Sequence, residues 1–98
     1  MNARLDQTVD LLGGLIAHPT VSADSNLAMI ADLADRLGDC GARVDLFTDE
    51  TGQKANLFAT LGPEEPGGIV LSGHTDVVPV EDQDWTSDPF VMENRDGR

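Results

Sequence analysis

The chain is poor in positive charge and in cysteine. Six Lys and Arg residues stand against 18 Asp and Glu residues among 98, a formal net charge of -12. Nucleic acids and anionic membranes are bound by neutralising phosphates with Lys and Arg, so neither is an expected partner. The single cysteine, Cys40, excludes an intramolecular disulfide and a Cys-rich zinc knuckle. Because it falls near the end of a predicted helix, we expect a small, buried, apolar side chain.

The N-terminus also lacks the long apolar run of a secretory signal or membrane span. Asp6 and Asp10 interrupt its apolar residues, and the stretch is too short to cross a bilayer. We therefore predict a cytoplasmic location.

Two amphipathic helices are predicted in the first 40 residues. Apolar residues spaced by four, three and four predict a helix over residues 5–17, which His18-Pro19 ends because the residue before proline avoids helical geometry. A second helix is predicted over residues 25–39, capped by Asp24 or Ser25. Its buried stripe comprises Leu27, Ile30, Leu33, Ala34 and Leu37.

The remaining sequence predicts strands. Residues 43–47 alternate between polar and apolar, and a turn at 49–52 leads to a second strand over 56–61. The continuous apolar run 69–71 is typical of a central strand covered on both faces. A last strand over 90–93 enters a turn at Asn94-Arg95-Asp96-Gly97, and its missing partner predicts a truncated hairpin. Helices followed by strands predict an α/β fold.

Chemistry is concentrated directly after the apolar run. In extended backbone, residues two apart share a face, so His74 and Asp76 are neighbours and Thr75 faces away. A carboxylate that accepts a hydrogen bond from one imidazole nitrogen leaves the other nitrogen free for a metal. Zinc needs three or four ligands, however, and a His-x-Asp pair is common by chance.

For the other residues that could take part in catalysis or metal binding, structural roles are predicted. Ser72 lies beside His74, but the sequence lacks the strained elbow of a serine nucleophile, so a serine hydrolase ranks below a metal site. His18, ahead of a proline, is predicted to be a loop residue rather than a ligand. Trp85 and Phe90 are expected to pack a loop against the sheet edge. The acidic residues Glu81, Asp82 and Asp84 are expected to be solvated, since they lack calcium-loop spacing.

The run Ser72-Gly73-His74-Thr75-Asp76-Val77-Val78-Pro79, followed by Trp85 and Asp88-Pro89-Phe90, resembles the first signature of the zinc-dependent aminoacyl hydrolases and exopeptidases. The resemblance spans nearly the whole chain and includes Pro19-Thr20-Val21-Ser22. It implies an α/β fold in which residues 1–98 begin a zinc-exopeptidase-like catalytic domain, a mixed sheet flanked by helices, truncated before it is complete.

The resemblance also implies a function and a site. His74 would be a metal ligand, and Asp76 the catalytic-site carboxylate that orients it. Family members hydrolyse amides with two Zn²⁺ or Co²⁺ ions, and this sequence supplies only one protein ligand because the others lie downstream. Residues 83–90 resemble the branch that removes the acetyl group from N-acetylornithine in arginine synthesis. The fragment alone is expected to be inactive, and the full-length protein to be a homodimer acting on a small N-acyl amino acid.

Two alternative functions are compatible with the sequence. The first is a deacylase or dipeptidase of the same family that acts on another substrate. The second is a stand-alone, non-catalytic acidic binding module of 98 residues, which predicts a stably folded chain at this length.

Overall fold

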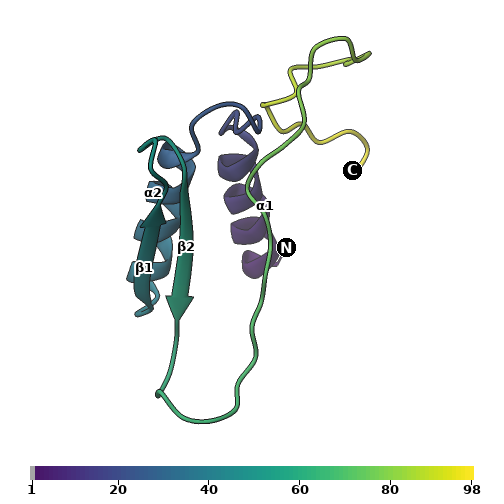
Figure 1. Ribbon diagram of the computed structural model, residues 1–98. Helices are drawn as coiled ribbons and strands as arrows, with labels where there is room; N and C mark the ends of the chain where they lie inside the picture. The colour runs from purple at the N-terminus through teal and green to yellow at the C-terminus, as the bar shows by residue number, and fades with distance from the viewer. Residues whose placement is uncertain (1) are drawn as a thin grey trace.

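The computed structural model describes residues 2–98, which form two helices followed by two strands (Figure 1). The order is α1 (Ala3–Ile16), α2 (Leu27–Asp39), β1 (Arg43–Thr48) and β2 (Ala55–Thr60). From Thr60 the chain makes a wide loop and returns past α1 without forming a further named helix or strand within the described residues. Both described helices fall short of the length and apolar character that crossing a membrane requires.

Helix α1 confirms the predicted first helix. Asn2 caps it, since its Oδ1 accepts hydrogen bonds from Arg4 N at 3.0 Å and Leu5 N at 3.4 Å. Among the glycines of the described residues, Gly13 and Gly14 are the two that side chains from other segments approach. A Cβ atom on Gly13 would lie 2.9 Å from Cε of Met92, and one on Gly14 would lie 3.3 Å from the Arg36 guanidinium.

Helix α2 confirms the second helix, with a different cap. The N-cap residue is Asn26, whose side chain forms no cap hydrogen bond, while Ser25 Oγ accepts from Leu27 N at 3.2 Å. The helix buries Met29 and Ile30 against the hairpin, where Ala55 of β2 is also buried. Cys40, just beyond the helix, is exposed, so the prediction that it is buried was wrong. Of the predicted buried stripe, Ile30 is buried, Leu33, Ala34 and Leu37 are half-buried, and Leu27 is 36% exposed, so the prediction was wrong at Leu27.

The strands β1 and β2 form the predicted hairpin. They pair antiparallel from Arg43↔Thr60 to Thr48↔Ala55. Asp49 stabilises the turn, because its Oδ1 accepts from Thr51 N at 3.1 Å and from Thr51 Oγ1 at 2.7 Å. The two helices and the hairpin confirm the predicted α/β class. The mixed sheet of a zinc-exopeptidase-like domain stays a prediction, since residues 2–98 form one two-stranded antiparallel sheet.

Two predicted strands are absent from the described residues, so both predictions were wrong. Ile69, Val70 and Leu71 are 90%, 79% and 92% exposed and join no ladder. A central strand needs a neighbour on each edge, and residues 2–98 supply none there. In the segment 90–93, Asp88 Oδ1 instead accepts from Phe90 N at 2.9 Å, and an Asx turn of this kind competes with strand pairing.

The molecule is flat and has a small core. Its radius of gyration is 15.9 Å, whereas a compact domain of this size has about 13 Å. Within residues 2–98, the buried apolar side chains are Met29, Ile30 and Ala55. Much of the apolar surface of these residues is therefore exposed.

Candidate metal-binding site

The loop that follows α1 fixes the position of the candidate site. Val77 N donates to Thr20 O and Ser22 N donates to Val77 O, both at 3.0 Å, in an isolated parallel bridge between Val21 and Val77. The hydroxyl of Thr20, a residue that is 5% exposed, donates to Thr75 O at 2.5 Å. Residues 75–77 are thus held beside residues 20–22, although more than fifty positions separate them.

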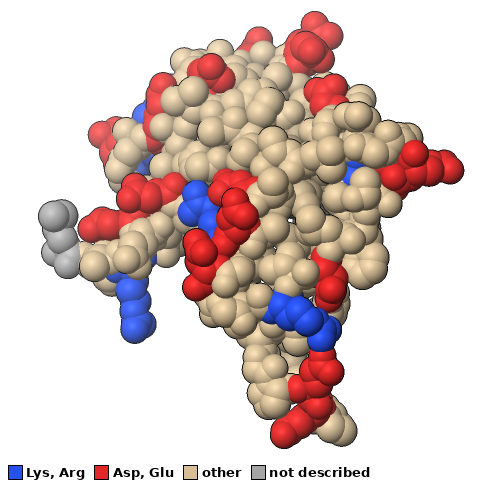
Figure 2. Space-filling model, turned by 90° about the vertical axis from the view of Figure 1, so that its left-hand side faces the viewer, with Lys and Arg blue, Asp and Glu red and all other residues tan. Residues whose placement is uncertain are grey.

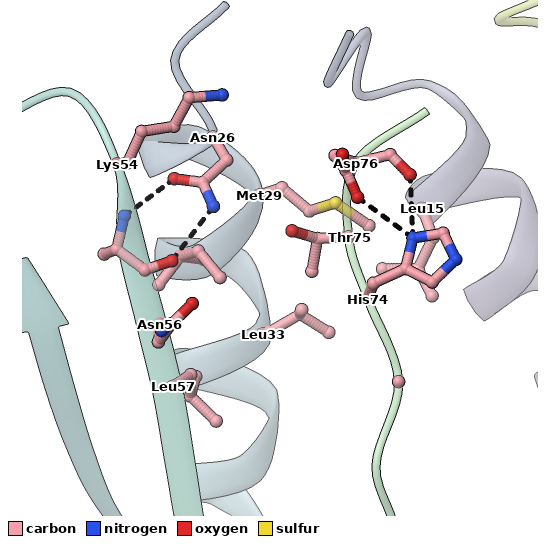
Figure 3. A pocket seen from close by; sticks show the side chains of 13 residues that line it. Leu15, Asn26, Met29, Leu33, Lys54, Asn56, Leu57, His74, Thr75 and Asp76 are labelled. Atoms are coloured by element: carbon pink, nitrogen blue, oxygen red, sulfur yellow. Dashed lines mark hydrogen bonds and ion pairs between the residues drawn. The ribbon is translucent and has the colours of Figure 1, made fainter. Parts of the chain in front are cut away.

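The predicted pair of side chains does meet. Nδ1 of His74 lies 3.0 Å from Oδ1 of Asp76 and also 3.0 Å from the Asp76 backbone oxygen (Figure 3). Both oxygens are acceptors, so Nδ1 is the donor and the lone pair of the neutral ring lies on Nε2. The His74 side chain is 85% exposed. Thr75 points to the other side of the segment, toward Met29, as the alternation predicted.

Asp76 has a second partner that the sequence did not reveal. The Ser22 hydroxyl donates to Asp76 Oδ2 at 2.6 Å. This bond lowers the pKa of Asp76 below its usual value; desolvation opposes it, and the His74 imidazole adds to the lowering. The one sequence signal that could have marked Ser22 as a site residue is its position at the end of the run Pro19-Thr20-Val21-Ser22, which is part of the family resemblance.

A groove of about 620 Å³ separates residues 73–76 from the β1–β2 hairpin. Its lining combines α1, α2, β2 and residues 73–76, with Leu15, Met29, Leu33 and Leu57 as apolar contributors. On the far wall, Asn26 bonds Ala55 twice: Nδ2 donates to the backbone oxygen and Oδ1 accepts from the backbone nitrogen, each at 2.9 Å. His74 and Asp76 therefore lie beside a largely apolar groove.

The donor set at His74 suits one corner of a metal site. An exposed imidazole whose Nδ1 is bound to a carboxylate has the arrangement found in metal-ligating histidines. Residues 2–98 contain no group of three or more His, Cys, Asp or Glu side chains that could hold a metal ion. A complete zinc site needs three or four ligands, so residues 2–98 alone do not form one.

The other histidine has a structural contact. Nε2 of His18 lies 3.1 Å from Asp32 Oδ2, and Arg36 Nε donates to Asp32 Oδ1 at 2.9 Å. His18 first and Arg36 second lower the pKa of Asp32. This cluster connects the end of α1 to α2, a role that the prediction of a simple loop residue at His18 did not include.

The C-terminal loops have the solvated character that was predicted, with one correction. Glu81, Asp82 and Asp84 are exposed. Trp85 is 51% exposed and lines a shallow groove with Ile16 at the end of α1, so its position there differs from the expected sheet edge. The face in Figure 2 carries many acidic side chains and few basic ones, with no basic patch in that view.

Comparison with known proteins shows that this chain is similar to part of several named deacetylases. The matching relatives include acetylornithine deacetylases: those of Edwardsiella ictaluri and Photorhabdus laumondii are each 41% identical over 105 residues, and that of Shigella sonnei is 37% identical. Each match covers 100% of this chain, which spans 27% of the relative's length. No family model and no solved structure matches. The resemblance to acetylornithine deacetylases that residues 83–90 predicted is confirmed as a similarity, and it extends over the whole chain.

Proposed function

We propose that the protein to which this sequence belongs is a metal-dependent amidohydrolase that converts N-acetylornithine and water to ornithine and acetate. The observation that carries the proposal is the identity of 37–41% to named acetylornithine deacetylases over 98–100% of the chain. The proposal includes a role in cytoplasmic arginine biosynthesis, Zn²⁺ or Co²⁺ as the metal, and a homodimeric full-length enzyme.

In this proposal, His74 and Asp76 supply part of the site. Nε2 of His74 would coordinate one metal ion, and Asp76 holds the ring by its Nδ1–H bond. A bound metal of this type lowers the pKa of water and polarises the amide carbonyl. The general base and the remaining ligands would lie outside residues 2–98. The chain by itself is therefore proposed to be inactive.

The small core argues against the alternative of a stand-alone binding module. Three buried apolar residues and an exposed Ile69-Val70-Leu71 run are a poor basis for independent stability.

The test is a deacetylation assay on the purified full-length protein. Release of the free amino acid is measured with N-acetylornithine, with other N-acyl amino acids, and with dipeptides, before and after chelation and metal restoration. We expect metal-dependent release that is fastest with N-acetylornithine. Preference for another acyl amino acid would move the assignment within the family, and activity that survives complete metal removal would refute the metal-dependent mechanism.

A further inference from the structure

The Asp76 carboxylate is engaged through both of its oxygens. Oδ1 faces Nδ1 of His74 at 3.0 Å, and Oδ2 accepts from the Ser22 hydroxyl at 2.6 Å. The same hydroxyl lies 3.2 Å from Val77 O. A hydroxyl has one proton to donate, and the shorter, charge-assisted contact is the stronger of the two, so that proton is directed to Asp76.

The backbone around Ser22 is fixed as well. Ser22 N donates to Val77 O at 3.0 Å, and Ser22 O accepts from Lys54 Nζ at 2.7 Å. The loop is therefore held by Val77 on one side and by Lys54, directly before β2, on the other. The hydroxyl needs only one side-chain torsion to reach Asp76, so little entropy opposes the bond.

We infer that Ser22 is a positioning residue whose hydroxyl holds the Asp76 carboxylate against the His74 imidazole. This inference rests on the proposed function. Asp76 is 51% exposed, so without the hydroxyl its carboxylate is free to turn toward water. The ring would keep its bond to the Asp76 backbone oxygen at 3.0 Å, and hence its tautomer, but would lose the adjacent negative charge that strengthens it as a ligand.

The experiment measures zinc affinity of the full-length protein by competition with a chromophoric chelator. Four variants are compared with the wild type: Ser22→Ala, Ser22→Thr, His74→Ala and Ser72→Ala. Ser22→Thr keeps a hydroxyl, and Ser72→Ala removes one from an exposed serine two residues from His74. Circular dichroism checks folding, and ¹⁵N spectra of the His74 ring in the metal-free protein report on its hydrogen bonding.

We expect Ser22→Ala to weaken zinc binding about tenfold, the lower end of the effect of losing an outer partner of a metal-ligating histidine. Its ¹⁵N ring signals should shift, Ser22→Thr should restore both properties, and Ser72→Ala should match the wild type. If His74→Ala loses zinc but Ser22→Ala binds zinc as the wild type does and its ring signals are unshifted, the positioning role of Ser22 is refuted while the proposed function stands. If His74→Ala binds zinc as the wild type does, the proposed function fails, and the inference with it.

Discussion

Replacing Asn26 with alanine should weaken the junction between α2 and β2 by about 2 kcal/mol. The Asn26 amide makes two hydrogen bonds to the backbone of Ala55, each 2.9 Å long. Ala55 is only 5% exposed, so water is poorly placed to replace them. With a net contribution of about 1 kcal/mol per bond, losing both costs about 2 kcal/mol. That free energy corresponds to a factor of roughly thirty in an equilibrium constant.

Amide hydrogen exchange at Ala55 in the full-length protein measures this effect directly. Exchange in Asn26→Ala should accelerate by a factor of about thirty, because the amide loses its acceptor and the start of β2 opens more often. Asn56→Ala is the matched control, since Asn56 is exposed on the same strand. Unchanged exchange at Ala55 in Asn26→Ala, or an equal acceleration in Asn56→Ala, would refute the reasoning.

Two further predictions concern the contacts of α1. The bonds from His18 and Arg36 lower the folded-state pKa of Asp32 below 3.8, so their stabilisation is fully present above that pH and is lost as pH falls through the folded pKa. Asp32→Asn should therefore lower the melting temperature at pH 6 more than at pH 2.5; equal losses would contradict this. Gly13→Ala should stabilise by less than the helix-propensity gain of about 1 kcal/mol, because the new Cβ meets Met92 Cε at 2.9 Å. The gain should be larger in a Met92→Ala background in urea unfolding, and equal gains in both backgrounds would show that the contact is absent.

Sequence patterns within short stretches were sufficient to predict the helices, the hairpin and the contact between His74 and Asp76. Helices α1 and α2 follow from apolar spacing and from local stop signals such as His18-Pro19. His74 and Asp76 lie in one extended stretch, so their contact follows from backbone alternation alone. No contact with a distant segment is needed to bring that pair together.

Contacts between distant segments could not be predicted in this way. Ser22 reaches Asp76 across 54 positions, and Asn26 reaches Ala55 across 29. The side chain of Asn26 was available as a helix cap, and tertiary structure directs it to β2 instead. Polar residues of this kind have several local partners, and the fold decides among them.

The apolar run 69–71 shows why a strand is harder to predict than a helix. Asp49 N donates to Lys54 O, which makes these two residues a hydrogen-bonded pair. Hydrogen-bonded and non-hydrogen-bonded pairs alternate along an antiparallel ladder, so the backbone N–H and C=O groups of Ala55, Leu57 and Ala59 point away from β1. The Asn26 side chain hydrogen-bonds the backbone of Ala55 on this edge of β2. No strand within residues 2–98 pairs with the rest of that edge. The composition of the run fits a buried strand, but residues 2–98 place no partner strand beside it.

The most direct test of the metal-dependent role of His74 is to measure metal content and deacetylation of N-acetylornithine together, in the full-length protein and its His74→Ala variant. We expect the wild type to bind Zn²⁺ or Co²⁺ and to release ornithine, and the variant to stay folded but to lose both metal at that position and activity. A His74→Ala variant with full metal content and full activity would contradict that role.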